Sequence, residues 1–490
     1  MKRTLLTLAA ALFLLPASAQ QVPEWLKEGI LYHIYPSSFK DSDGDGIGDL
    51  EGIRSKLPYV KSLGANTIWL SPVFRSEFED GGYDITDFYR IDPRFGTNSQ
   101  LVQLVREAHD LGIRVCLDLV AGHTSDKHPW FRQSSEADPE LQYSDYYIWS
   151  DSKDAFPTKK FVRSDAARDG NYMKNFFDIQ PALNYGYLHP DPAQPWQQGY
   201  DDPGPTAVRN ELKNIISFWM DKGVDGFRCD VASFVPLEFW RAAREAVRAV
   251  NPAAIWLAET VHQSFGCLAR YRGVRSELDY DMYEAFDLEY EYDIREAFDK
   301  YLQGKIVLSH YLDMLNFQEA IYPANYNKLR FLENHDQPRI CSYVKDEAAL
   351  QNYTAMLYFL KGTTLLYAGQ EFENDHLPSL FEKEPIDRAS GKDLTPLLKK
   401  LAGIKRLLGT QDYFRAEAND EQDIAVMQRA GAAGRFVGVF SLQAKSAGVC
   451  VPAADGTYEN LLDGSTVTVK AGCIHCDGAP VIFRAPEREG

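Results

Sequence analysis

The 490-residue sequence has few cysteines, no excess of basic residues and no apolar run long enough to cross a bilayer. Its seven cysteines are an odd number without the spacing of a disulfide-rich small domain, which excludes a disulfide framework as the basis of the fold. The net charge of −18 argues against a nucleic-acid partner, which requires a basic face. With 45% hydrophobic and 25% charged residues, the composition is that of a globular protein.

A signal peptide is predicted for residues 1–19. Lys2 and Arg3 precede a mostly apolar run over 5–15, and Ala17-Ser18-Ala19 forms a small-residue cleavage site. A signal anchor is the alternative, but the run is shorter than a membrane-spanning helix. We therefore expect export to the periplasm or the medium, with no membrane insertion after cleavage.

Export permits disulfides, and the cysteines fall into two groups. Cys116 shares a strand face with Asp118 whereas Cys229 opposes Asp230, so these two thiols are expected on opposite sides of a barrel wall and should not pair. Cys450, Cys473 and Cys476 cluster near the C-terminus. One local disulfide is expected there, with a metal site as the weaker alternative.

Helix-period and strand-like segments alternate along most of the chain. Eight strands can be counted, with the first at 29–36, the seventh at 328–335 and the last at 363–367, and most are followed by a helix-period segment. This alternation favours a parallel sheet with right-handed crossovers, and eight units predict an α/β fold of the (β/α)₈ TIM-barrel type. In such a barrel the active site lies at the C-terminal ends of the strands.

The predicted barrel is interrupted once and extended once. A long insertion, rich in aromatic residues, follows the third strand, and short β-like runs separated by Gly and Asp follow the last helix. We predict a barrel over 20–123 and 207–409, an insertion domain over 124–206 and a small antiparallel β domain over 410–490. Most of the insertion's aromatic side chains are expected to form its own core.

The segment from Gly226 to Asp230 ends an apolar strand in the middle of the chain. Alternate side chains of a strand share a face, so Arg228 and Asp230 point the same way. The pair has two interpretations, a structural ion pair or a carboxylate nucleophile whose pKa is held low by a fixed cation.

Other strand ends favour the second interpretation. Acidic residues also follow strands three, five and seven, at Asp118, Glu259 and Asp336. The 29 residues from Asp230 to Glu259 are about one βα unit, which places the two on neighbouring strands. Glu259 ends an apolar run, so burial should raise its pKa as a general acid requires. Asp230 is then the nucleophile and Asp336 the stabiliser of an oxocarbenium-like transition state, as in a retaining glycosidase.

A glycine-punctuated loop carries carboxylates at alternate positions, Asp41, Asp43, Asp45 and later Asp49. Such spacing lets several oxygens converge on one hard cation, and we expect Ca²⁺ there. A solvated acidic turn is the alternative, because no Glu stands at the twelfth position as in an EF-hand.

From about Leu31 onward the chain resembles the α-amylase family of glycoside hydrolases. The motifs occur in the family's order: Gly82-Tyr83-Asp84-Ile85-Thr86-Asp87-Phe88, Asp118-Leu119-Val120 with His123, Gly226 to Asp230, Glu259, and Asn334-His335-Asp336-Gln337-Pro338-Arg339. The resemblance implies the same roles for Asp230, Glu259 and Asp336. It also implies that a substrate subsite is lined by Tyr83, Asp84, His123, Arg228 and His335.

The resemblance has consequences for metals as well. It implies that Ca²⁺ is bound by Asp41, Asp43, Asp45, Asp49 and the carbonyl of Ile47, and that no organic cofactor is used. Family members usually have Asn before the strand-three His, where it binds a second Ca²⁺. Here the residue is Gly122, so we predict that this second site is missing.

We therefore expect an exported retaining glycosidase that hydrolyses α-glucosidic bonds of malto- or isomalto-oligosaccharides or starch-like α-glucans. Val231 and the segment 180–184 resemble the oligo-1,6-glucosidase subgroup, which leaves the linkage open. One alternative is a transglycosylase that uses the same three carboxyl groups. The other is a non-catalytic barrel like the ancillary subunits of amino-acid transporters, which tend to lose these carboxylates.

Overall fold

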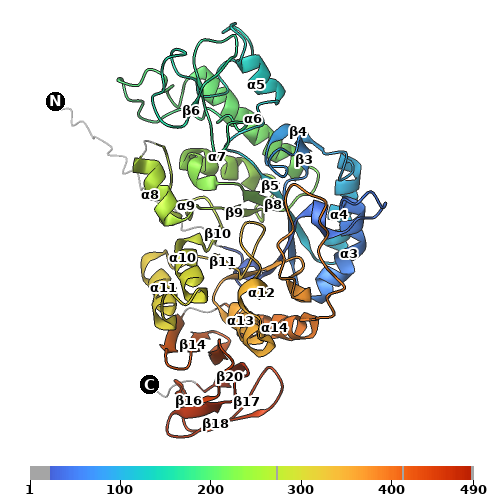
Figure 1. The fold of residues 1–490 in the computed structure, drawn as a ribbon, viewed down its shortest axis with the longest axis vertical. Helices are drawn as coiled ribbons and strands as arrows, with labels where there is room; N and C mark the ends of the chain where they lie inside the picture. The colour runs from blue at the N-terminus through green and yellow to red at the C-terminus, as the bar shows by residue number, and fades with distance from the viewer. Residues whose placement is uncertain (1–21, 272–273, 411–412, 487–490) are drawn as a thin grey trace, which may run out of the picture.

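The computed structural model describes residues 22–271, 274–410 and 413–486. Figure 1 shows a central barrel, with an insertion above it in the view and a β domain below it. The predicted signal peptide lies outside the described residues. Within them, no helix combines the length and the apolar character needed to span a membrane.

Eight parallel strands close into a barrel in the order β1-β12-β11-β10-β9-β8-β5-β2. This confirms the predicted fold class. The barrel strands are β1 Ile30–Ile34, β2 Thr67–Leu70, β5 Arg114–Leu119, β8 Gly226–Cys229, β9 Ile255–Ala258, β10 Leu288–Tyr290, β11 Lys328–Arg330 and β12 Thr363–Tyr367.

Helices follow the strands and cover the outside of the barrel (Figure 1). The longer ones are α3 Leu50–Ser62, α4 Asn98–Asp110, α6 Pro203–Met220, α7 Leu237–Arg248, α8 Gln263–Tyr271, α10 Tyr292–Leu302, α11 Leu308–Ile321, α13 Glu347–Phe359 and α14 Thr395–Leu408. The short ones are α1 Glu24–Lys27, α2 Pro36–Phe39, η1 Ala232–Phe234, α9 Asp279–Met282, α12 Ile340–Tyr343 and η2 Gln370–Phe372.

Strand alternation divides the apolar side chains between the inside and the outside of the barrel wall. Leu31, Trp69, Cys116 and Leu257 belong to one buried cluster inside the barrel. Cys229 belongs to the larger cluster between strands and helices. The two thiols therefore lie on opposite sides of the wall, as predicted from the strand period.

Gly226 allows β8 and β9 to approach closely. A Cβ atom at this position would lie 2.1 Å from the backbone oxygen of Ile255. The register pairs Cys229 with Ala258, so the next residues along both strands, Asp230 and Glu259, leave the barrel at the same level. A glycine at the start of β8 thus helps to bring two carboxyl groups together at its end.

Strand β11 is shorter than we predicted. We expected a strand over 328–335, but β11 ends at Arg330. Beyond it, the Asn334 side chain accepts a hydrogen bond from the backbone N–H of Asp336 at 2.9 Å. This side-chain turn competes with the sheet ladder, and it places His335 and Asp336 on a loop above the strand.

The insertion lies between β5 and α6 and packs over the barrel rim together with the β3–β4 hairpin (Figure 1). Its aromatic residues form its core as expected, since Trp130, Phe131, Tyr147 and Trp149 are all buried. The elements here are β3 Phe74–Ser76, β4 Ile85–Ile91, α5 Pro129–Ser134, β6 Phe161–Val162 and β7 Tyr172–Met173.

The C-terminal β strands form a small antiparallel domain, which was also predicted. Its main sheet has the order β13-β14-β15-β20, and Asn316 on α11 ties it to the barrel by donating to the backbone oxygen of Ala416 at 2.8 Å. The strands are β13 Tyr413–Asn419, β14 Ile424–Gly431, β15 Gly434–Ser441, β16 Ala447–Cys450, β17 Gly456–Glu459, β18 Thr466–Val469, β19 Cys473–Cys476 and β20 Val481–Ala485.

Cys450 and Cys473 are direct cross-strand partners in the β16–β19 pair, with their sulfur atoms 2.7 Å apart. Directly opposite residues of antiparallel strands bring their Cβ atoms within disulfide range. We predict that these two thiols are oxidised by dioxygen or an added disulfide, losing two protons and two electrons as the S–S bond forms. The mass should fall by two hydrogens.

Thiol titration of the folded protein checks this. Cys450 and Cys267 are exposed and Cys473 is half-buried, so the oxidised protein should show one reactive thiol, that of Cys267. Cys450→Ser should free Cys473 and give two. Three reactive thiols after exposure to an oxidant would contradict the pairing.

Candidate active site

Arg228 is the centre of the cluster at the C-terminal end of the barrel. Its Nη1 lies 2.9 Å from an oxygen of Asp118 and 2.9 Å from one of Asp230, and its Nη2 lies 2.6 Å from Glu259. The side chain of Arg228 is only 1% exposed. One guanidinium therefore holds three carboxyl groups from neighbouring strands β5, β8 and β9.

Val231 connects the nucleophile candidate to the acid candidate. Its backbone N–H donates to Glu259 Oε2 at 2.8 Å. To do so, Val231 adopts a left-handed backbone with φ 40° and ψ 44°, which is unfavourable for a β-branched residue. Such strain persists where surrounding contacts impose it, and it is concentrated at functional sites.

Asp336 completes the predicted set of three carboxyl groups. Its side chain is 40% exposed, and its Oδ2 lies 3.3 Å from His335 Nε2. The same nitrogen lies 2.7 Å from the hydroxyl of Tyr83, which donates to Asp118 at 3.3 Å. The predicted residues Tyr83, Arg228 and His335 thus join all the carboxyl groups into one network.

A buried ion pair closes the loop that carries Asp336. Arg339 Nη1 lies 2.6 Å from Glu333, and its Nη2 donates to the backbone oxygen of Ala368. Both side chains of the ion pair are fully buried. Because breaking a buried pair leaves an uncompensated charge, this contact holds the loop ends together.

Asp84 makes its hydrogen bonds within its own segment. Its carboxylate is fully buried and accepts hydrogen bonds from Ser76 Oγ and from the backbone of Glu79 and Asp80. Asp80, another acid of this turn, interacts electrostatically with Asp230 and Asp336, and burial together with these neighbouring carboxylates raises its pKa to about 7. Sequence reasoning missed Asp80.

His123 is placed by two hydrogen bonds within the protein. Its Nε2 donates to the backbone oxygen of Tyr83 at 3.1 Å, so the ring is the Nε2–H tautomer, and Nδ1 accepts from Asn175 at 3.0 Å. Burial lowers the pKa of His123 to about 4.

A Cβ atom at Gly122 would lie 2.8 Å from the same Asn175 amide. The missing second Ca²⁺ site stays a prediction.

Burial dominates the protonation of the carboxyl groups around Arg228. It raises the pKa of Glu259 to about 8 and that of Asp118 to about 7, with Arg228 acting in the opposite direction in both cases. The direction for Glu259 is the one we expected. With a single guanidinium for three carboxyl groups, Glu259 is the group that best retains a proton at neutral pH.

The expectation of a low pKa for Asp230 is wrong in direction. Burial raises the pKa of Asp230, and Arg228 counteracts this effect without reversing it. The strand pattern correctly placed the cation next to the carboxylate. What it omitted was the desolvation that a fully enclosed pair experiences.

The acidic loop brings together three of the four carboxylates that we expected to converge. Asp41, Asp43 and Asp49 each offer an oxygen within 4.8 Å of the others, whereas Asp45 lies outside this group. Gly44 and Gly46 both have φ of 89°, a conformation that glycine adopts without strain. The donor set is all oxygen, which fits a hard cation such as Ca²⁺.

Three aromatic residues support the cluster and were not predicted. The hydroxyl of Tyr290 on β10 accepts from Arg228 Nε at 3.2 Å, and Trp69 Nε1 donates to Asp118 at 3.2 Å. His33 stacks on Trp69 with ring centroids 3.6 Å apart. All three side chains point into the barrel, from β1, β2 and β10. Strand alternation could have indicated this, but the strands are apolar on both faces, which makes the inward positions hard to recognise in the sequence.

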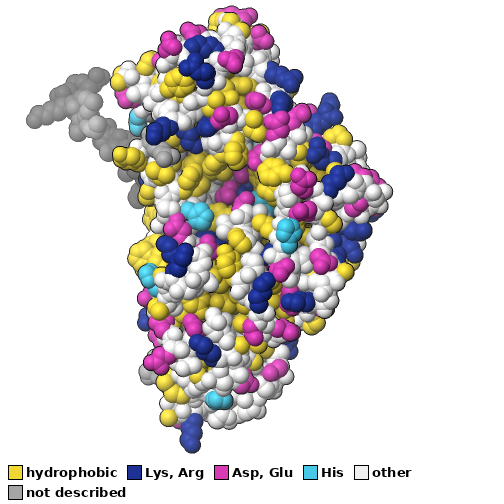
Figure 2. Space-filling model, viewed as in Figure 1, with side chains coloured by type: hydrophobic (Ala, Val, Ile, Leu, Met, Phe, Trp, Pro, Cys, Tyr) yellow, Lys and Arg dark blue, Asp and Glu magenta, His cyan; other side chains and the backbone are white. Residues whose placement is uncertain are grey.

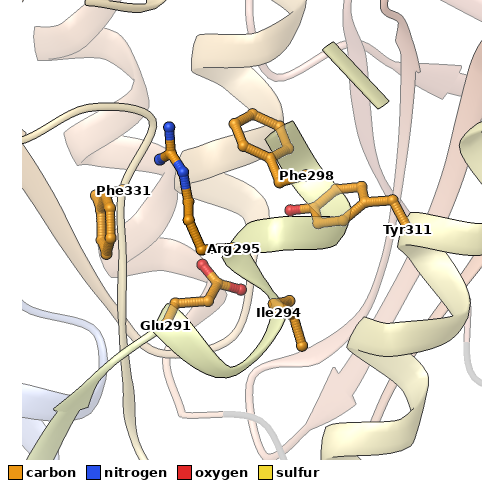
Figure 3. A pocket seen from close by; sticks show the side chains of 6 residues that line it. All are labelled: Glu291, Ile294, Arg295, Phe298, Tyr311 and Phe331. Atoms are coloured by element: carbon orange, nitrogen blue, oxygen red, sulfur yellow. The ribbon is translucent and has the colours of Figure 1, made fainter. Parts of the chain in front are cut away.

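The surface is hollowed at the level of the barrel, with acidic side chains in the floor and hydrophobic ones around them (Figure 2). A separate small pocket lies between α10, α11 and the segment after β11 (Figure 3). Its charged residues are already paired, Glu291 with Arg330 and Arg295 with Asp299. It therefore serves packing, and the catalytic candidates are elsewhere.

Comparison with known proteins agrees with this geometry. Residues 33–424 match the model of the alpha amylase catalytic domain, and residues 415–483 match that of the bacterial alpha amylase C-terminal domain. The chain belongs to the alpha-amylase family. The predicted family resemblance is confirmed, and the protein is a glycoside hydrolase of that family.

The proteins similar to this chain include some named oligo-1,6-glucosidase and some named alpha-amylase. The probable oligo-1,6-glucosidase 3 of Bacillus subtilis is 31% identical over 79% of this chain and 71% of its own. Alpha-amylase 3 of Dictyoglomus thermophilum is 30% identical over 74% and 68%. An alpha-amylase structure from Lactobacillus plantarum superposes with a TM-score of 0.79, at 29% identity over 94% of this chain and 99% of the other.

The raised pKa of Glu259 predicts how activity depends on pH. A carboxyl group with a pKa of about 8 is protonated below that pH and loses its proton above it, so kcat/KM for glucoside hydrolysis should fall about tenfold per pH unit above about pH 8. Circular dichroism over the same range should show an intact fold. An activity that stays constant up to pH 10 would contradict Glu259 as the proton donor.

Proposed function

We propose that this α-amylase-family hydrolase is an exported, retaining enzyme that cleaves α-glucosidic bonds through a covalent intermediate on Asp230. Glu259 is the acid/base, and Asp336 stabilises positive charge on the sugar ring. One observation carries the proposal: Asp230 and Glu259 leave neighbouring strands at the same level and contact the same guanidinium of Arg228.

The arrangement supports a double displacement. Asp230 attacks the anomeric carbon as the bond to the leaving oxygen breaks, and the proton of Glu259 goes to that oxygen. Glu259 then removes a proton from water as the water oxygen attacks the same carbon and the bond to Asp230 breaks. Both steps pass through an oxocarbenium-like state, which the charges of Asp230 and Asp336 stabilise.

The substrate class is the finer part of the proposal. We infer that the substrates are malto- or isomalto-oligosaccharides, because relatives named oligo-1,6-glucosidase and alpha-amylase both match at 30–31% identity. Asp80, Tyr83 and His335 lie around the carboxyl groups where the glucose unit must bind. A transglycosylase with the same residues differs only in the acceptor, a sugar hydroxyl in place of water.

Two amide variants distinguish the roles of the carboxyl groups. Asp230→Asn should lower kcat by at least about four orders of magnitude on every α-glucoside, the scale on which loss of a covalent nucleophile acts. Glu259→Gln should lower maltose turnover about 10²- to 10⁴-fold but affect α-glucosyl fluoride much less, because fluoride leaves without a proton. Kinetics on both substrates measure this.

Asp313→Asn, an exposed carboxylate on α11, is the matched control and should behave like the wild type. If Asp230→Asn kept substantial activity, or if Glu259→Gln lost both substrates equally, the assigned roles would be wrong. Product analysis on maltose, isomaltose and sucrose at high concentration identifies the acceptor. New oligosaccharides that appear faster than free glucose would favour the transglycosylase.

The acidic loop is proposed to bind structural Ca²⁺. Asp41, Asp43 and Asp49, with the carbonyl of Ile47, would hold the ion, and Asp45 lies outside this group. The loop leads directly into α3, where Asp49 caps the helix by accepting from the backbone N–H of Gly52 at 2.7 Å. Lys383, from the segment after β12, donates to the backbone oxygen of Asp45 at 2.7 Å.

Chelation should therefore lower the melting temperature by several degrees, since saturating a site at 100 times its Kd contributes about 2.7 kcal/mol. Added Ca²⁺ should restore it. Asp43→Asn should abolish the response, whereas Asp138→Asn, in the insertion, should keep it. A wild-type melting curve that does not respond to chelator and Ca²⁺ would remove the metal from the proposal.

Export rests on the N-terminal pattern alone. Recovery of a mature protein that begins near Gln20 from the periplasm or medium supports it, and retention of residues 1–19 in the cytoplasm contradicts it.

A further inference from the structure

A groove of about 260 Å³ opens between the insertion and helix α8. Phe176 on the insertion side and Phe265, Leu268 and Ala269 on the α8 side line it. Phe265 and Leu268 are 37% and 40% exposed. About 150 Å³ is enough to hold benzene, so the groove has room for a ring-sized apolar group.

Three stacked phenyl rings lie at this groove, on segments that also carry active-site residues. The ring centroids of Phe176, Phe234 and Phe265 are 5.7 to 6.1 Å apart, and their planes are within 27° of parallel. Each ring follows a residue of the active site. Phe234 comes four residues after Asp230, Phe265 six residues after Glu259, and Phe176 directly after the Asn175 that bonds to His123.

The position of the groove identifies which part of a substrate would reach it. Glu259 delivers its proton to the leaving oxygen, so the leaving group must lie next to Glu259. The segment that follows Glu259 in the chain borders this part of the cleft. Helix α8 begins four residues after Glu259. Since α8 lines the groove, we place the groove on the side of the cleft where the leaving group departs and an acceptor enters.

The lining suits an aromatic ring better than a sugar. Sugar hydroxyls both donate and accept hydrogen bonds, and the described side chains that line the groove offer donors, from lysine, but no acceptor. Apart from its apolar side chains it contains Lys159, Lys160 and Lys174. Lys160 Nζ lies 5.3 Å from the ring centroid of Phe176. These cations, in a chain of net charge −18, disfavour a cationic occupant.

We propose that this groove binds the aglycone: an aromatic leaving group, neutral or anionic, joined to glucose through the bond that the enzyme cleaves. In transglycosylation, the same groove admits a phenol as the acceptor of the glucosyl group. The phenol oxygen attacks the anomeric carbon while Glu259 takes its proton, and the bond to Asp230 breaks. The inference rests on the proposed function and adds the chemistry of the leaving group to it.

The test compares two substrates that share the glucose unit, 4-nitrophenyl α-glucoside and maltose. Phe265→Ala and Leu268→Ala should each lower kcat/KM for the aryl glucoside about tenfold, equal to about 1.4 kcal/mol, and change that for maltose less than twofold. Phe317→Ala, on α11 and 54% exposed, is the matched control and should change neither. Melting curves should show that all three variants fold.

Equal losses on both substrates would overturn the proposal, because the groove would then be a sugar subsite. No loss on either would also overturn it. If the wild type cleaves no α-glucoside, the proposed function fails, and calorimetric titration with 4-nitrophenol then decides about the groove. Binding to the wild type and to Phe317→Ala that is weakened about tenfold in Phe265→Ala would support the groove, whereas no binding would exclude it.

Discussion

The active site depends on one buried charge, the guanidinium of Arg228. Removing this ion from water costs several kcal/mol, and only well-placed partners compensate for it. The partners are Asp118, Asp230 and Glu259, on three adjacent strands. The register of the barrel strands therefore also sets the position of the carboxyl groups, because a one-residue slip of β5 or β9 would remove one of the three partners of Arg228.

Carboxyl groups outnumber cationic groups around Arg228, and this excess of acids gives the site its chemistry. A single cation cannot keep several enclosed carboxyl groups ionised, so at least one proton is retained. Glu259, with the pKa near 8 and the contact to the strained Val231 backbone, retains it best. The geometry thus assigns an acid and a nucleophile to two groups that share the same neighbour.

How much could be predicted from the sequence differs between strand ends and loops. Strand alternation and the βα repeat fix where residues at strand ends point, and the structure brings Asp118, Arg228, Asp230 and Glu259 together there. No such rule positions Asp80 and Asp84, two acids of the turn. Gly81 and Gly82 both have positive φ, so the chain reverses there and the period-2 rule does not apply. Asp80 faces the cleft, while Asp84 bonds to its own loop.

By itself, the sequence determined the barrel, its two additions and the order of the acidic strand ends, because hydrophobic period and chain order are local properties. Tertiary structure alone decided three things: which acid of a glycine-rich turn reaches the cleft, the net direction of the pKa of Asp230, and the stack of Phe176, Phe234 and Phe265. Each depends on groups distant in the chain that share one enclosed space. Desolvation and packing in that space arise only when the chain is folded.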